Sequence, residues 1–317
     1  MKPRILVLSA GGPAGKALVR CLQIDFEVVA ADCNPINLKF STAPINVIVP
    51  KSTDKNYIKK VIEICKKYKI THILPQNDGE VLQVSIYKDK LPKSYVPEDI
   101  TVMTLQDKVE TTWLIPELTP INYDMIKDIK YPCWVRATQG AGGKGSFVAK
   151  DKSSLLKWQS INPGITKWQY SEYLSGDSNV GVDMIVENGK ILAYQMKERV
   201  RYIPGQTMTG ITGSADTIKI IKNKEVLDIC QQAIDKLHIK DRCVLAADLK
   251  SNKKGKYKIT EINPGRFLTS SLVSFHLTGY NIPFYLICDA LDSLPKYPLG
   301  KYIIRQMDSF PRMVNKL

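Results

Sequence analysis

The sequence predicts an α/β protein whose N-terminal part is a doubly wound parallel sheet and whose C-terminal part is α+β. Over the first hundred or so residues, short apolar runs alternate with segments of helical period, a pattern that builds parallel sheets. From about residue 131 onward, several apolar runs are joined by short Gly- or Asn-containing turns, which are typical of antiparallel hairpins. A length of 317 residues suits two or three packed units.

The N-terminal segments follow one another as strand and helix. Residues 5–8 form a buried-type apolar run that ends in a Gly-rich turn. The apolar side chains of residues 56–68 (Ile58, Val61, Ile62 and Cys65) recur at helical spacing. We therefore expect strands at residues 5–8, 26–30, 47–49 and 71–74, and helices at residues 16–23 and 56–68.

The C-terminal segments include more strands than helices. Asn188-Gly189 lies between two apolar runs and predicts a tight hairpin turn. Amphipathic spacing marks residues 224–237 as a helix. We expect strands at residues 131–137, 146–150, 180–186, 190–195, 244–250 and 256–262, and helices at residues 153–159, 224–237 and 282–290.

Composition is that of a soluble globular protein, with 44% hydrophobic and 24% charged residues. No apolar run reaches the ~18 residues of a membrane span, so we expect no membrane partner. Met1 leads directly into a strand-like segment, without the apolar region of a signal peptide. Seven scattered cysteines without a C-x-x-C pair favour reduced thiols and a cytoplasmic location.

The net charge of +14 comes from lysines dispersed in pairs, without a long basic block or interleaved aromatic residues. A solvated lysine-rich surface explains this pattern better than nucleic-acid binding, which stays a minor alternative. The three histidines, His72, His238 and His276, are dispersed and favour structural over catalytic roles.

A first Gly-rich turn spans residues 9–16 and nearly matches two phosphate-binding motifs. A Walker A loop would need Gly in place of Ala10 and Ser or Thr in place of Ala17. The dinucleotide fingerprint is interrupted by Pro13, although Asp32 would suit a ribose. A tight strand-to-helix turn is the simpler interpretation, and dinucleotide binding is the alternative.

A second Gly-rich segment, residues 140–145, joins two predicted strands. Arg136 lies near the end of the first strand, and four glycines accompany Lys144 in the loop. Glycines let backbone N–H groups approach phosphate oxygens, whose charge Arg and Lys neutralise. The segment therefore predicts a phosphate-binding loop, with a plain hairpin tip as the alternative.

Two carboxylates and an amide are predicted to converge on neighbouring strands. Glu261 and Asn263 are two residues apart and so share a face, and Asp248 lies on the preceding strand. Such hard oxygen ligands suit Mg²⁺. Arg266, just beyond, could stabilise charge on a transferred phosphoryl group.

The order of these motifs resembles the ATP-grasp superfamily, in its branch of carbamoyl-phosphate-synthase-like and carboxylate–amine ligases. The likeness is carried by Lys108, the Gly-rich loop, E-Y-L-S-G at residues 172–176 and E-I-N-P at residues 261–264. It covers nearly the whole chain. It implies a pre-ATP-grasp domain at residues 1–105, a small lobe with the lid loop at residues 106–178, and a large lobe with the metal site at residues 179–317.

The resemblance also implies roles for individual residues. Lys108 and Arg136 would contact the ATP phosphates, and Gly142 and Gly143 would lie in the lid over them. Adenine would face Glu172, Tyr173 and Leu174, and Asn179 or Asp177 stands where relatives have a ribose-binding acid. The metal ligands would be Asp248, Glu261 and Asn263, holding Mg²⁺ or Mn²⁺. The catalytic side chains would be Arg266, Arg199 and Lys144, and Gly265 is an insertion before Arg266 relative to the usual motif.

The implied activity is that of an ATP-dependent ligase, which activates a carboxylate as an acylphosphate for attack by an amine or a similar nucleophile. Its partners would be small-molecule carboxylates and amines, with specificity near residues 207–214 and 269–275. Homodimers are common among such relatives. The alternative is a non-catalytic regulatory or interaction protein that binds ATP or a dinucleotide.

Overall fold

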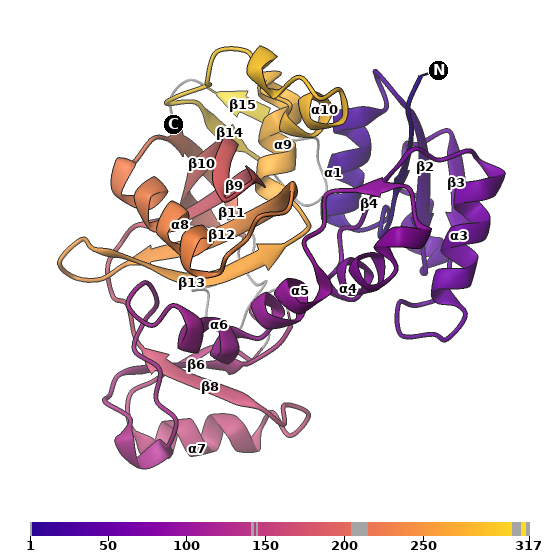
Figure 1. The fold of residues 1–317 in the computed structure, drawn as a ribbon. Coiled ribbons are helices and arrows are strands. Elements are labelled where there is room, and N and C mark those ends of the chain that lie inside the picture. Colours follow the sequence, from indigo (N-terminus) through magenta and orange to yellow (C-terminus); the bar gives the residue numbers. More distant parts are fainter. Residues whose placement is uncertain (1, 141–142, 144, 204–214, 306–311, 315–317) are drawn as a thin grey trace.

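The chain is described by a computed structural model that covers residues 2–140, 143, 145–203, 215–305 and 312–314. The described strands form three sheets, which we call the N-terminal, large and small sheets (Figure 1). Helices and strands are mixed throughout, with a parallel N-terminal sheet and antiparallel sheets after it. This confirms the predicted fold class.

The N-terminal sheet is parallel in every pairing and has the order β3-β2-β1-β4-β5. Its strands are β1 (Arg4–Val7), β2 (Glu27–Asp32), β3 (Ile45–Ile48), β4 (His72–Leu74) and β5 (Lys93–Ser94). Helix α1 (Pro13–Leu22) packs on one face, while α3 (Tyr57–Lys67) and α4 (Asp78–Ile86) pack on the other. Helices on both faces make the sheet doubly wound.

Three further helices complete this region. A short α2 (Pro35–Leu38) follows β2, and α5 (Asp99–Gln106) and α6 (Lys108–Leu114) lead from the N-terminal sheet towards the small sheet (Figure 1). Helix α1 begins three residues before the expected start, because Pro13 takes the first helical position, where its missing N–H costs nothing.

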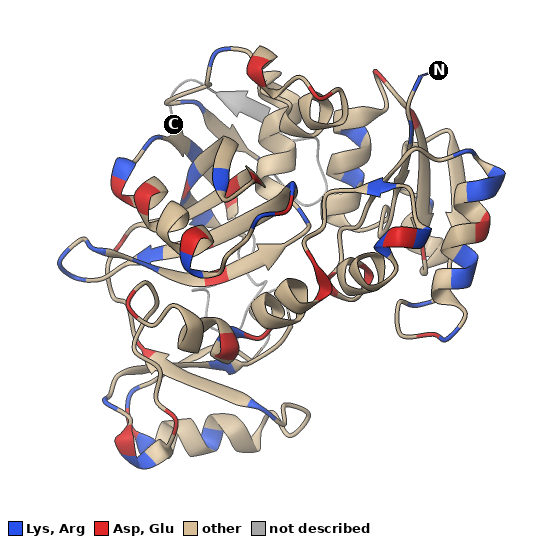
Figure 2. Ribbon diagram, viewed as in Figure 1, with Lys and Arg blue, Asp and Glu red and all other residues tan. Residues whose placement is uncertain are grey.

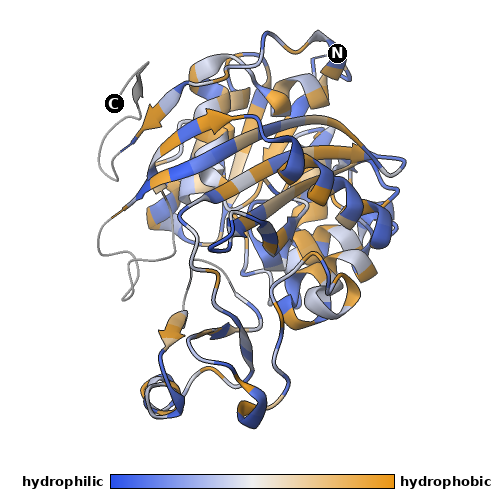
Figure 3. Cartoon of the chain, turned by 90° about the vertical axis from the view of Figure 1, so that its left-hand side faces the viewer, coloured by the Kyte–Doolittle hydropathy of each residue, from blue (hydrophilic) through white to orange (hydrophobic). Residues whose placement is uncertain are grey.

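The small sheet is antiparallel and lies at the bottom of Figure 1 together with one helix. It contains β6 (Cys133–Ala137), β7 (Phe147–Ala149) and β8 (Trp168–Glu172), in the order β7-β6-β8. Helix α7 (Lys152–Ser160) begins with a capping box between Asp151 and Ser154. Figure 3 shows this unit extending away from the body of the molecule.

The large sheet has the order β13-β12-β9-β10-β11-β14-β15, and its pairings are antiparallel. Helix α8 (Lys224–Lys236) packs on one face. On the other face lie α9 (Thr269–Thr278) and α10 (Ile282–Ile287), which also join α1 in one core. The strands are β9 (Asn179–Glu187), β10 (Lys190–Tyr202), β11 (Ala215–Ile221), β12 (Cys243–Ser251), β13 (Tyr257–Pro264), β14 (Tyr302–Ile304) and β15 (Arg312–Val314).

Three expectations about the large sheet and its helices were wrong in detail. Strand β10 runs to Tyr202, well past the expected end at residue 195. The last expected helix, at residues 282–290, ends at Ile287. Helix α9 was not expected as a helix at all, and it ends where Gly279 adopts a left-handed conformation at φ 71°.

Charged residues occur in all three parts of the described structure, including α3 and the tip of the β12–β13 hairpin (Figure 2). This dispersion agrees with a lysine-rich surface. In the described residues, no helix combines the length and the apolar character that a membrane span requires.

Candidate active site

A cavity of about 670 Å³ lies between the small and large sheets. The small sheet contributes Arg136, and the large sheet contributes Asp248 and Glu261. Pro13, at the start of α1, lines the cavity from the N-terminal side. A cavity of this size, with several polar and charged side chains in its lining, suits a ligand as large as a nucleotide.

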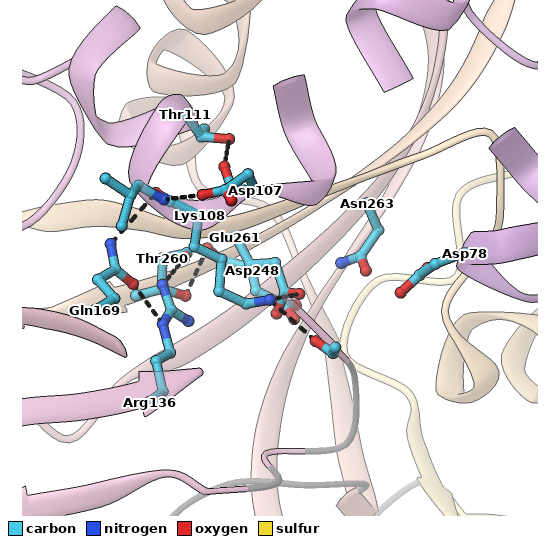
Figure 4. Close-up of polar contacts among 12 residues, drawn as sticks. Asp78, Asp107, Lys108, Thr111, Arg136, Gln169, Asp248, Thr260, Glu261 and Asn263 are labelled. Carbon is cyan, nitrogen blue, oxygen red and sulfur yellow. Dashed lines mark hydrogen bonds and ion pairs between the residues drawn. The ribbon is translucent and has the colours of Figure 1, made fainter. Parts of the chain in front are cut away.

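Arg136 joins the small sheet to the large sheet across the cavity. Its Nε donates to Gln169 Oε1 at 2.7 Å, and its Nη2 donates to the carbonyl oxygen of Thr260 at 2.6 Å (Figure 4). Burial lowers the pKa of this guanidinium, opposed by the nearby carboxylates Glu261 and Asp248. The cation is thus held by neutral acceptors, which leaves its charge available to an anionic ligand.

Lys108 is the first residue of α6, a helix capped by the Asp107 side chain. Its ammonium Nζ donates to the carbonyl oxygen of Gly140 at 3.0 Å. The same Nζ lies 3.2 Å from Glu261 Oε1, and the side chain is only 8% exposed (Figure 4). Lys108 therefore connects the Gly-rich segment with the acidic strand β13.

Asp248, Glu261 and Asn263 converge as the alternation of residues along their strands predicts. Asp248 pairs in register with Glu261, and Ala246 with Asn263, so the three polar side chains share one face. Among the described residues, no group of three His, Cys, Asp or Glu could hold a metal. The site therefore consists of two carboxylates with an amide oxygen, a hard donor set that fits Mg²⁺ in the presence of phosphate oxygens.

Each of these donors faces a basic side chain. Asp248 Oδ1 accepts from Arg199 Nη2 at 2.5 Å, and Glu261 faces Lys108. Asn263 Oδ1 accepts from Arg266 Nη2 at 2.5 Å. The close alternation of acidic and basic groups suits a site that receives both metal ions and phosphates.

The inserted Gly265 leaves Arg266 pointing into the cavity. Gly265 has φ 67°, and its N–H donates to the carbonyl oxygen of Val244 at 2.8 Å. A Cβ at this position would come within 2.9 Å of the Val81 side chain, so only glycine fits without displacement. Arg266 lines the cavity, and its Nε donates to Asp78 Oδ1 at 2.6 Å. Sequence reasoning missed Asp78, because nothing in the sequence links it to Arg266.

Glu172, Tyr173 and Leu174 line the cavity between the small and large sheets. Two residues were expected as alternatives for binding the ribose of ATP. Asn179 lines the cavity, and Asp177 is not among the lining residues. The Asn179 amide donates to the hydroxyl of Tyr202. Lys250 also lines this region, where its Nζ donates to the carbonyl oxygen of Gly176 at 3.0 Å. Sequence reasoning found neither Tyr202 nor Lys250, which depend on strand register.

The Gly-rich segment is described in part. Gly140 and Gly143 line the cavity, with φ 110° and φ 69°. The predicted sites Gly142 and Lys144 lie outside the described residues, as does the expected specificity segment at residues 207–214. The positive φ values agree with the choice of glycine in this loop.

Neighbouring residues of the chain occupy the space around the first Gly-rich turn. The Asp32 carboxylate accepts the N–H of Gly11 at 2.9 Å and that of Asn34 at 2.8 Å. A Cβ on Gly11 would lie 2.5 Å from the backbone of Asn37, so the glycine is needed for packing. These contacts favour the tight-turn interpretation over dinucleotide binding.

Comparison with family models assigns both parts of the chain. The PylC-like N-terminal domain matches residues 5–96. The carbamoyl-phosphate synthase L chain, ATP binding domain, matches residues 109–290, which is more than half of the chain. The chain belongs to this ATP-grasp family. No curated protein matches it significantly.

Solved structures of other ATP-grasp proteins share the fold. N5-carboxyaminoimidazole synthetase from Staphylococcus aureus, complexed with ADP, has a TM-score of 0.73 at 14% identity, covering 96% of this chain and 83% of that one. L-amino acid ligase from Bacillus licheniformis has a TM-score of 0.68 at 12% identity, covering 96% and 79%. Biotin carboxylase from Campylobacter jejuni has a TM-score of 0.68 at 15% identity, covering 98% and 78%.

Proposed function

We propose that the chain is an ATP-dependent ligase that phosphorylates a carboxylate and passes the acyl group to an amine. The observation that carries this proposal is the convergence, in one cavity, of the cations Lys108 and Arg136 with the oxygen donors of β12 and β13. Membership of an ATP-grasp family, and similar folds in an amino acid ligase and in an ADP complex, add support.

The proposed division of the chain follows from the cavity. The nucleotide binds between a small lobe at residues 106–178 and a large lobe at residues 179–317, beside a pre-ATP-grasp domain at residues 1–105. Adenine lies against Glu172, Tyr173 and Leu174, with the ribose near Asn179. The phosphates extend towards Lys108, Arg136 and the Gly-rich loop, including Gly142, Gly143 and Lys144.

The reaction has two steps. A carboxylate oxygen attacks the γ-phosphorus of ATP, and the bond to the β-phosphate oxygen breaks to release ADP. The amine nitrogen then attacks the acyl carbon, phosphate leaves, and the nitrogen loses a proton. Such phosphoryl transfer asks the protein for positioning and charge neutralisation rather than for a nucleophile of its own.

The residues of the cavity supply this positioning. Lys108 and Arg136 hold the phosphate oxygens, while Arg266, fixed by Asp78, and Arg199 face the reacting groups. Asp248, Glu261 and Asn263 hold Mg²⁺, for which Mn²⁺ could substitute. When bound, the metal neutralises charge on the transferred phosphoryl group.

The test is an ADP-release screen of small carboxylates crossed with amines, followed by mass spectrometry of each product. Glu261→Gln and Asn263→Ala should lower turnover by roughly 10²–10³-fold, because one well-placed electrostatic interaction in the transition state is typically worth that much. The matched control Glu225→Gln, exposed on α8, should keep wild-type activity. Circular dichroism should show all three variants folded.

Two outcomes would contradict the proposal. Nucleotide binding without ADP release in any substrate mixture would favour the non-catalytic alternative. Full activity in both Glu261→Gln and Asn263→Ala would make the carboxylates a plain surface feature.

A further inference from the structure

Gln169, on β8, connects the two cations that the proposed function assigns to the phosphates of ATP. Its side chain is only 2% exposed and is not among the residues that line the cavity. It lies directly opposite Arg136 in the register of β6 and β8, so the two side chains project from the same face of the small sheet. Sequence reasoning missed Gln169, because nothing in a single sequence pairs it with Arg136.

Both polar atoms of the Gln169 amide have partners, and these partners fix its orientation. Oε1 accepts from Arg136 Nε at 2.7 Å (Figure 4). Nε2 donates to the carbonyl oxygen of Lys108 at 3.3 Å and to Thr112 Oγ1 at 3.1 Å. Thr112 Oγ1 in turn donates to the same Lys108 oxygen at 2.7 Å. Because a guanidinium only donates and a carbonyl oxygen only accepts, the amide satisfies these groups in one orientation alone.

These hydrogen bonds set the position of Arg136 relative to the start of α6. Lys108 is the first residue of that helix, so the amide ties the guanidinium to the segment that carries the second cation. On the other side of the guanidinium, Nη2 donates to the carbonyl oxygen of Thr260 at 2.6 Å. A side chain held at two points has lost most of its rotamer freedom before a ligand arrives, so less conformational entropy is lost on binding.

The lack of charge on Gln169 matters as much as its hydrogen bonds. A glutamate at this position would form a buried ion pair with Arg136 and cancel the charge that attracts a phosphate. It would also place a carboxylate oxygen against the carbonyl oxygen of Lys108, to which the amide now donates. The amide therefore holds the guanidinium and leaves its positive charge for the ligand.

We propose that Gln169 is a positioning residue for the binding of the ATP phosphates, because it fixes Arg136 against the start of α6 without neutralising it. This inference rests on the proposed function and adds to it a residue that lies behind the wall of the cavity. Loss of the amide should therefore weaken the binding of the phosphates and leave the binding of the base unchanged.

Calorimetric titration of the full chain tests this role with two probes. One is a non-hydrolysable ATP analogue with Mg²⁺, and the other is adenosine, which lacks the phosphates. Gln169→Glu should weaken binding of the analogue by about tenfold or more, because the new carboxylate neutralises Arg136. Gln169→Met, which is similar in length but makes no hydrogen bonds, should weaken it several-fold. The affinity for adenosine should stay at the wild-type value in both variants, whereas loss of a purely structural residue would lower both affinities together.

A double-mutant cycle with Arg136→Met assigns the effect to this pair. Once the guanidinium is absent, adding Gln169→Met should leave the affinity for the analogue unchanged. Gln159→Met is the matched control, because Gln159 donates to the Tyr170 hydroxyl at 2.7 Å in the same lobe and is not among the lining residues. The control variant should bind the analogue as wild type does.

Three results would each overturn the inference: wild-type affinity of Gln169→Met for the analogue, an equal loss of adenosine binding, or a further loss when Gln169→Met is added to Arg136→Met. If Gln169→Glu does not fold, Gln169→Met and its cycle still decide between these outcomes. The ADP-release screen separates this inference from the proposed function. ADP release by the wild type together with any of the three results would refute only the inference. Weaker binding of the analogue in the variants, without ADP release in any substrate mixture, would keep the positioning role and refute the ligase.

Discussion

Lys197 and Asp183 form an ion pair in which both side chains are completely buried, with Nζ and Oδ2 2.7 Å apart. Burial lowers the pKa of Lys197, opposed by the charge of Asp183. Both side chains also contact Ser271, and Asp183 accepts the N–H of Leu268. The pair therefore positions α9 from outside the lining of the cavity.

Replacing Lys197 by Met should destabilise the fold strongly. Removing one partner leaves the Asp183 charge buried and unpaired, which typically costs ~3–5 kcal/mol. The control is Lys224→Ala, which breaks a pair whose lysine is 87% exposed and should cost less than ~1 kcal/mol. Urea unfolding measures both. Equal midpoints for the two variants would mean that Asp183 is neutralised in another way.

Glu80, on α4, should make stability depend on pH. Burial raises the pKa of this carboxyl to about 7. The folded chain then holds a proton at pH values where the unfolded chain has lost it, so stability falls as pH rises from about 4.5 to 7. Between pH 5 and 8, wild type should lose up to about 3 kcal/mol relative to Glu80→Gln. Urea unfolding at several pH values measures this difference. A difference in unfolding free energy between wild type and Glu80→Gln that stays constant from pH 5 to pH 8 would contradict the prediction.

At the scale of elements, the Gly-rich loop between β6 and β7 depends on left-handed backbone. Gly143 has φ 69°, and a non-glycine residue there costs about 1 kcal/mol. Gly189, in the β9–β10 turn, has φ 77° and open space around it. The two glycines thus carry a similar backbone cost, but only Gly143 lines the cavity.

We expect Gly143→Ala to weaken ATP binding several-fold, because the loop loses the conformation that brings its backbone to the phosphates. Gly189→Ala should lower stability by a similar ~1 kcal/mol and leave ATP affinity unchanged. Thermal unfolding gives the stability, and calorimetric titration with Mg-ATP gives the affinity. If Gly143→Ala binds Mg-ATP with wild-type affinity, the loop does not bind phosphate and is only a hairpin turn.

Helices with one apolar face could be predicted from the sequence, and a helix without an apolar period could not. Helix α8 shows a clear helical period and was expected to within a residue. Helix α9 buries consecutive residues from Ser270 to Phe275, so it has no amphipathic period to detect. The end of β10 was missed because its last part, from Lys197 to Arg201, is mostly charged and has no run of apolar residues that would indicate a strand.

The same distinction applies to the candidate site. Asp248, Glu261 and Asn263 could be placed together because strand alternation alone brings them to one face. Asp78 and Arg305 come from segments far apart in the sequence, and only tertiary packing brings Asp78 to Arg266 and Arg305 to the cavity. A single sequence carries no signal for such contacts.

At the scale of the whole molecule, the cavity is where separate parts of the chain are tied together. Arg136 and Lys108 connect the small-sheet side to β13. Asp78 connects α4, in the N-terminal part, to Arg266. A ligand that engages these cations therefore binds to side chains that connect all three parts, and its binding should stabilise the whole fold rather than one lobe.

Mg-ATP should accordingly raise the melting temperature of the full chain, and NADH should not. A ligand that binds only the native state stabilises it by RT ln(1 + [L]/Kd), roughly 2.7 kcal/mol at 100 Kd. NADH should have no effect, because Asp32 and Asn37 already occupy the space around Gly11 in the first Gly-rich turn. Differential scanning fluorimetry measures both shifts, with Glu261→Gln expected to reduce the shift by Mg-ATP. A shift with NADH and none with Mg-ATP would move the nucleotide to that turn and exclude the proposed ligase.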